Sequence, residues 1–284
     1  MRELPAGIVS LELTPTTPVP GQALAAHAGL SLEGDSLTVA LNAHPFAVTV
    51  QGQEAVAVGG TGAFFEPGDP ELTIQTGANP VWRQPWAISD RDWVFQQLTL
   101  TGDAAAIDQA SIDAERERLN ALWSIVTSSP QWTAAFQLPI SSYLEISADY
   151  GARRSYNGGP YRTYHEGVDF SAYSGTPVYA PAGGTVALAE PLFVRGGAVI
   201  LDHGLGVYSG YYHLSAIHVE PGQHVEAGEV LGEVGTTGLS TGNHLHWDLI
   251  VNGTWVDAIS WLDQNTACWL LEALGSACTQ PAVN

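Results

Sequence analysis

Two histidines separated by one residue, His244 and His246, carry the strongest chemical signal in the sequence. They lie in the stretch 243–249, where apolar and polar residues alternate, and this alternation predicts a β-strand. Residues two apart on a strand project from the same face. Two imidazoles side by side need partners for several ring nitrogens. The pair therefore indicates either two metal ligands or one ligand beside a proton-transfer group.

A second pair, His165 and Asp169, lies four residues apart. In an extended segment these two residues face the same way, and Gly167 between them lets the backbone pass close to an ion. Together with the His-x-His strand they give nitrogen, nitrogen and oxygen ligands with a fourth position free for water. This arrangement is expected of catalytic rather than structural zinc. Two histidines and a carboxylate also suit iron(II) oxygenases, so ligand type alone leaves the metal open.

A third histidine, His213, stands near the end of an expected strand over 207–214. A lone histidine at such a place is more often a structural residue. We consider a functional role for His213 only because the other two segments indicate a metal site. The remaining histidines carry no comparable pattern, and we expect them to be surface, turn or structural residues. They are His27, His44, His203, His218 and His224.

The elements that position these residues follow from the pattern along the chain. Short alternating segments broken by turn formers, such as 36–41, 46–50 and 71–74, predict an immunoglobulin-like β-sandwich over 1–101. Apolar residues at helical spacing predict a helical linker within 102–135, with Glu115 on a polar face. Strand patterns return over 136–265, and a tail covers 266–284. The expected apolar stripe of the helix is Ile112, Leu119, Leu122, Trp123 and Val126.

Composition narrows the function classes. The 284 residues are 45% hydrophobic and 13% charged, as in folded proteins. A net charge of −20 opposes binding to nucleic acid. The chain has no lysine, which excludes a P-loop lysine and a Schiff base. No apolar run approaches the roughly 18–20 residues of a membrane span. Cys268 and Cys278 are the only cysteines, and their spacing allows a disulfide or two buried thiols.

Over about 136–262 the chain resembles the lysostaphin-type, or LytM-like, zinc metallopeptidases. Asn243 departs from the family pattern, since many relatives have proline there, but this leaves the ligand set untouched. The N-terminal region also looks like the accessory region of some members, in a looser match. The segments that carry the resemblance are 164–170, 175–181, 199–204, 211–215 and 235–246.

The resemblance implies that His165, Asp169 and His246 bind one Zn²⁺ and that His213 and His244 form the catalytic pair. It implies an all-β fold with a linking helix, in which the C-terminal domain is an antiparallel β metallopeptidase with a narrow groove. The implied activity is zinc-dependent hydrolysis of peptide cross-links in bacterial peptidoglycan by metal-activated water. We expect His244 to act as the acid–base and His213 to stabilise the oxyanion, although the sequence does not decide between them.

Two other functions have to be weighed. Residues 238–242 fit the G-x-S-x-G pattern of serine hydrolases, but that motif needs a helix after it, and here a strand follows, so Ser240 is expected in a turn. Some relatives of the family lose the metal ligands and regulate other wall hydrolases. The intact ligands oppose this, although a blocked groove would silence a complete site. The first residues do not read as a signal peptide. We nevertheless expect a monomer in the extracellular space or cell envelope, with its leader removed.

Overall fold

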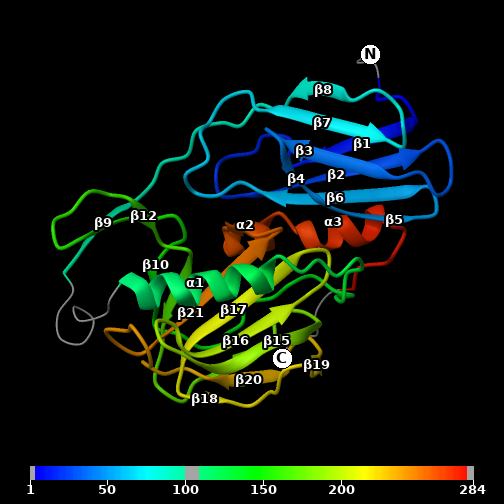
Figure 1. Ribbon diagram of the computed structural model, residues 1–284. Helices are drawn as coiled ribbons and strands as arrows, with labels where there is room; N and C mark the ends of the chain where they lie inside the picture. Colours follow the sequence, from blue (N-terminus) through cyan, green and yellow to red (C-terminus); the bar gives the residue numbers. More distant parts are fainter. Residues whose placement is uncertain (1–3, 100–108, 280–284) are drawn as a thin grey trace.

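The computed structural model describes residues 4–99 and 109–279, and it is mostly β with three α-helices. The N-terminal strands form one body that lies on a larger C-terminal β-domain, with α2 (Ala258–Asp263) and α3 (Thr266–Ala273) between them (Figure 1). The predicted β-rich fold class is thus confirmed. The expected boundary between 101 and 102 lies outside the described residues. No helix in the described ranges is long and apolar enough to cross a membrane.

The N-terminal body consists of two antiparallel four-stranded sheets with a shared core. Leu24 and Ala57 of one sheet and Leu72 and Ile74 of the other belong to this buried cluster. The orders β1-β2-β6-β5 and β4-β3-β7-β8 are consistent with the predicted immunoglobulin-like sandwich. The strands are β1 Ile8–Thr14, β2 Ala23–Leu30, β3 Leu37–Leu41, β4 His44–Pro45, β5 Ala47–Gln51, β6 Glu54–Gly60, β7 Glu71–Thr76 and β8 Trp82–Pro85.

The outer face of the sheet that contains β2 and β6 is buried as well. Alternate residues of β2 point to the two sides, and Ala23 and Ala25 join a core cluster that includes Trp261 of α2 and Leu270 of α3. Small alanine side chains let the sheet approach these helices closely. The two halves of the molecule therefore meet in a second core cluster, separate from the one inside the sandwich.

A disulfide between Cys268 and Cys278 ties α3 to the end of the described chain. The sequence allowed either this disulfide or two buried thiols.

The C-terminal domain is built on an eight-stranded antiparallel sheet with the order β10-β13-β21-β17-β16-β15-β19, in which β22 also pairs with β21. Its central strands are buried on both faces. One face belongs to the core cluster that also contains Ala23 and Trp261. The other face packs against α1 (Gln109–Trp123). The strands are β10 Glu145–Ala148, β13 Gly167–Ser171, β15 Gly184–Leu192, β16 Gly196–Asp202, β17 Val207–Leu214, β19 His224–Val225, β21 His244–Val251 and β22 Thr254–Val256.

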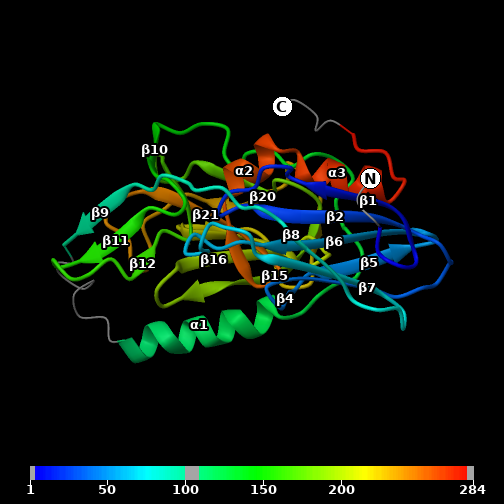
Figure 2. The ribbon, with the colours of Figure 1, turned by 90° about the horizontal axis from the view of Figure 1, so that it is seen from above.

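Two smaller sheets flank this domain. One contains β14 (Pro177–Tyr179), β20 (Val230–Glu233) and β18 (Ala216–Ile217). The other contains β12 (Thr163–Tyr164), β11 (Arg153–Tyr156) and β9 (Phe95–Leu98), and it stands at one end of the molecule in both views (Figures 1 and 2). In this second sheet β9 pairs in parallel with β11, so the segment that follows the sandwich becomes part of the C-terminal domain.

Helix α1 lies along the outer face of the large sheet (Figure 2) and departs from the sequence prediction in two ways. The helix ends at Trp123, and Val126 beyond it is 44% exposed instead of packed. Glu115 is buried, not on a polar face, because it precedes the buried Leu119 by one turn and so shares its side of the helix. Its carboxylate pairs with a distant arginine, Arg195.

Candidate active site

Three neighbouring strands place the chemical side chains. Asp169 on β13 lies opposite His246 on β21, and His246 lies opposite Tyr212 on β17. Directly opposed residues of antiparallel strands share a face, so these three side chains come together. His244 precedes His246 by two residues and takes the same face. The His-x-His strand thus has the geometry that the sequence predicts.

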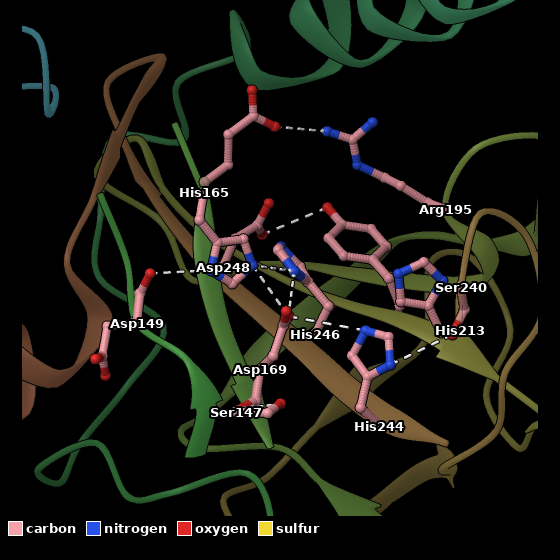
Figure 3. A network of polar contacts seen from close by, with 12 residues as sticks. Ser147, Asp149, His165, Asp169, Arg195, His213, Ser240, His244, His246 and Asp248 are labelled. Carbon is pink, nitrogen blue, oxygen red and sulfur yellow. Dashed lines mark hydrogen bonds and ion pairs between the residues drawn. The ribbon is translucent and has the colours of Figure 1, made fainter. Parts of the chain in front are cut away.

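Three ligand atoms converge between these strands and the turn before β13 (Figure 3). Nε2 of His165 lies 3.0 Å from Oδ1 of Asp169 and 3.0 Å from Nδ1 of His246. The remaining distance, from His246 Nδ1 to Asp169 Oδ1, is 2.8 Å. Zinc with ligands at about 2.0–2.2 Å separates tetrahedral ligand atoms by roughly 3.4 Å. Small outward movements of these side chains would therefore accommodate an ion.

The protonation of His165 follows from its other ring nitrogen. Nδ1 lies 3.0 Å from the carbonyl oxygen of Asp149, and a carbonyl only accepts, so Nδ1 carries the hydrogen. In the neutral ring, the Nε2 lone pair then faces Asp169 and His246. The side chain is 1% exposed, which fixes its orientation. A histidine held in this way is a typical metal ligand.

The charges suit cation binding. Burial acts to raise the pKa of Asp169, but hydrogen bonds and charges from His165 and His246 outweigh it and hold this pKa well below its usual range. Burial lowers the pKa of His246, although Asp169 opposes that shift. An ionised carboxylate beside neutral imidazoles is the state in which such residues bind a metal ion.

His213 reaches the site through a β-bulge. Leu214 pairs with Gly197 and Tyr211 pairs with Val199, so Tyr212 and His213 together oppose a single residue of β16. His213 has a φ of 63°, in the left-handed region that side chains other than glycine rarely adopt. Regular alternation would place Tyr212 and His213 on opposite faces. The bulge instead brings the His213 ring to 4.7 Å from that of His244 and 6.3 Å from that of His246, measured between centroids.

Both candidate catalytic histidines have one nitrogen fixed by a carbonyl. Nδ1 of His213 donates to the carbonyl of Thr237, and Nδ1 of His244 donates to that of Gly242, each at 2.8 Å. Burial lowers the pKa of His213 to about 3, with His244 and His246 adding to the effect. Nε2 of His244 lies 3.8 Å from Oδ1 of Asp169. In each ring the nitrogen that is not bonded to a carbonyl is Nε2, and that of His244 faces a candidate ligand.

Arg195 connects α1 to this site, and no sequence pattern indicated it. Its guanidinium pairs with Glu115 of α1 at 3.0 Å and with Glu166, the neighbour of His165, at 3.1 Å. Its carbonyl oxygen accepts from the backbone N–H of His213 at 2.9 Å. Glu115 also accepts from the backbone N–H of Val194 at 2.7 Å. The helix thereby supports the loop against which the bulged histidine rests.

Tyr212 and Asp248 form a buried pair behind His246 that no motif in the sequence indicated either. Asp248 is fully buried, and it accepts from the indole of Trp255 at 3.0 Å and from the Tyr212 hydroxyl at 3.4 Å. Burial raises the pKa of Asp248 and holds that of Tyr212 well above its usual range. The Tyr212 ring lies 5.6 Å from the His246 ring and under the guanidinium of Arg195. The one signal in the sequence that could have indicated Asp248 is the alternation along β21, which puts it on the same face as His246.

Residues with other expected roles lie elsewhere or serve packing. Ser240 is in the turn before β21, with its hydroxyl 3.3 Å from Nδ1 of His244, and no helix follows it. His203 is fully buried and bonds to the carbonyl of Gly183 and to Ser209, which is a structural role. The other histidines outside the site have these surroundings: His27, His218 and His224 pair with glutamates, and His44 is exposed in β4.

Comparison with known proteins finds similarity to one peptidase family over the segment that holds the site. Residues 163–258 match the model of peptidase family M23. The peptidoglycan DD-endopeptidase ShyA of Vibrio cholerae is 39% identical over 126 residues, which cover 44% of this chain and 29% of ShyA. Lysostaphin of Staphylococcus staphylolyticus is 39% identical over 107 residues, 35% of this chain and 22% of lysostaphin. The chain thus spans less than a third of the length of these curated relatives.

The likeness extends beyond the matched segment in one solved structure. A Pseudomonas aeruginosa crystal structure assigned to peptidase M23 superimposes with a TM-score of 0.62 at 28% identity. The superposition covers 86% of this chain and 94% of that chain, so it extends into the N-terminal sandwich. The five segments of the sequence that suggested a lysostaphin-type domain overlap the family match. Residues 163–258 of this chain thus match peptidase family M23, and this segment contains all five candidate site residues.

Proposed function

We propose that this protein is a zinc-dependent endopeptidase that hydrolyses peptide cross-links of bacterial peptidoglycan. The observation that carries the proposal is the convergence of His165 Nε2, Asp169 Oδ1 and His246 Nδ1 on one point. Two imidazole nitrogens and one carboxylate oxygen are a donor set that fits a single catalytic zinc ion. The names of relatives such as ShyA, a peptidoglycan DD-endopeptidase, supply the substrate class.

The proposed chemistry divides between the ion and the two remaining histidines. Zn²⁺ held by the three ligands would supply a water of lowered pKa and polarise the scissile carbonyl. His244 would take a proton at Nε2 and deliver it to the leaving amine, since this atom lies beside Asp169. His213 would stabilise the oxyanion. Because its Nδ1 hydrogen is given to Thr237 and its pKa is lowered to about 3, Nε2 carries no proton in the free protein. His213 would therefore have to gain a proton at Nε2 during the reaction, which the negative charge developing on the oxyanion would favour.

The wider setting is proposed on the same grounds. We infer an extracellular or cell-envelope location and a peptidoglycan peptide as partner, because three of the curated relatives are named peptidoglycan DD-endopeptidases. The net charge of −20 supports the expectation that nucleic acid is not a partner. We further propose the division into a sandwich (1–101), a helical linker (102–135), a metallopeptidase domain (136–265) and a tail (266–284), acting as a monomer.

The test is cleavage of purified peptidoglycan by the protein with and without a zinc chelator, reading new amino groups against new reducing ends. New amino groups that vanish with chelator and return with added zinc are the expected result. New reducing ends would mean that the site cuts sugars. Bound zinc without any cleavage would favour a regulator of other wall hydrolases instead.

A further inference from the structure

Positive charge is concentrated in one short segment that borders the site, although the chain as a whole is strongly acidic. The sequence has nine arginines, no lysine and 29 acidic residues. Three of the arginines, Arg153, Arg154 and Arg162, fall within ten residues. These residues belong to β11 and to the turn that joins it to β12, in the small sheet completed by β9. The three arginines have different surroundings, and these surroundings identify the one that faces the site.

Arg153 serves the contact between the two halves of the molecule. Its Nη2 donates to the carbonyl of Ala63 in the sandwich at 2.6 Å, and its guanidinium lies over the rings of Phe64 and Trp93. Arg162 is exposed in the turn. Neither contact pattern involves the candidate ligands. Alternation along β11 places Arg154 on the face opposite to Arg153.

Arg154 borders the three candidate ligands. Its Nη2 lies 3.6 Å from Oδ2 of Asp169, whereas the other carboxylate oxygen, Oδ1, faces His165 and His246. Its Nε donates to Oε1 of Gln96 at 3.3 Å, and the register of the parallel strands sets these two residues opposite one another. At 3.6 Å the contact to Asp169 is an ion pair and not a hydrogen bond. Asp169 therefore leaves the guanidinium free to bind a second anion.

The side chain is placed to meet a ligand that enters the site. It is 18% exposed, which is enough for contact with a ligand and buried enough to limit screening by water. The two contacts account for two of the five N–H groups of the guanidinium. This planar fork is the group that best matches a carboxylate, through two parallel hydrogen bonds. A protein of net charge −20 repels acidic substrates at long range, so a local cation is needed to hold one.

We propose that Arg154 is a specificity-determining residue that binds a free carboxylate of the substrate peptide next to the bond that is cut. The proposal rests on the proposed peptidase function and deepens it. Gln96 orients the guanidinium, and it belongs to β9, outside the 163–258 family match. The segment after the sandwich thus takes part in selecting the substrate. The carboxylate can be a peptide C-terminus or an acidic side chain, which share the same chemistry.

The test uses four synthetic peptides with the same scissile bond and the full-length, zinc-loaded protein. Two of them differ only in a side-chain carboxylate or its amide beside that bond, and two differ only in a C-terminal carboxylate or amide. We expect at least a tenfold preference in kcat/KM for the carboxylate in one pair, and that pair identifies the source. Arg154→Gln should reduce this ratio at least fivefold, and Arg154→Lys should restore part of it. Arg162→Gln, the matched control, should keep the ratio.

Three results would overturn the proposal. One is a wild-type protein that cleaves carboxylate and amide equally in both pairs. Another is an Arg154→Gln variant that loses rate equally on all peptides together with bound zinc, because Arg154 would then only position Asp169. Failure of the proposed function has a different signature, since no peptide and no peptidoglycan would be cut. If nothing is cut, the role of Arg154 is tested by binding instead, through the Kd values of the carboxylate and amide peptides. Equal Kd values within each pair would overturn that role.

Discussion

Strands β21 and β17 present their histidines to the same site in different ways. On β21, plain alternation brings His244 and His246 to one face, and the pairing with β13 sets Asp169 opposite His246. On β17, a bulge turns His213 toward the site, and the carbonyl oxygens of Arg195 and Thr237 hold it there. Half of the site is thus a consequence of local sequence, whereas the other half depends on distant contacts.

The largest expected effect comes from breaking the β21 half. His246→Ala should lose both bound zinc and activity, because it removes one of three ligands. His244→Ala should lose activity and keep the metal. Metal content measured by atomic spectroscopy, together with peptidoglycan cleavage, separates the two. Release of zinc by His244→Ala would show that the roles within the pair are assigned wrongly.

The next effect comes from removing the support of the β17 half. Arg195→Met should lower the free energy of unfolding by about 3 kcal/mol, since it leaves the buried carboxylate of Glu115 without its charged partner. It should also reduce kcat, because the loop under His213 loosens, while zinc remains bound. Denaturant unfolding and steady-state kinetics measure both effects.

A surface ion pair provides the control for that variant. Arg118 of α1 pairs with Glu190, and both side chains are largely exposed. Arg118→Met should therefore leave Tm and kcat close to wild type. Equal losses in the two variants would mean that α1 acts only through general stability and does not position His213.

A pH dependence distinguishes the β17 half in the metal-free protein. The pKa of His213 is lowered to about 3 by burial, so its ring stays neutral when folded and gains a proton near pH 6.5 when unfolded. Between about pH 3 and pH 6.5 the unfolded state therefore binds more protons than the folded state does. Stability is complete above pH 6.5 and is lost as the pH falls toward 3.

NMR titration of the His213 ring and unfolding curves at several pH values check this expectation. The ring should not titrate between pH 5 and 8. His213→Gln should show a weaker decline of stability with acid than the wild type. A His213 ring that titrates near pH 6.5 in the folded protein would contradict its burial.

The smallest expected effect concerns Tyr212, which links the two strands. Tyr212→Phe keeps the ring beside His246 but removes the hydroxyl that donates to buried Asp248. Because the indole of Trp255 still donates to Asp248, the loss should be about 1 kcal/mol. Activity should remain within a few-fold of wild type. A larger loss of activity than of stability would assign Tyr212 a direct role in the reaction.

Sequence patterns predicted many of the regular elements and missed the irregular ones. The strands expected at 36–41, 46–50 and 71–74 appear as β3, β5 and β7, shifted by at most one or two residues. The helix was expected as well, but Glu115 was placed on the wrong face. A charged residue usually stays in water, and only a distant arginine could show that this one is buried.

The sequence by itself determined the β-rich fold class and the alternation of the His-x-His strand, and its resemblance to a known family indicated which three residues converge. The first two properties depend on side-chain period and residue type, which are local. The tertiary structure decided the bulge at His213, the burial of Glu115 against Arg195 and the packing of the sandwich on α2 and α3. Each of these joins residues far apart in the chain, and their free energy comes from burial and pairing that exist only after the segments meet.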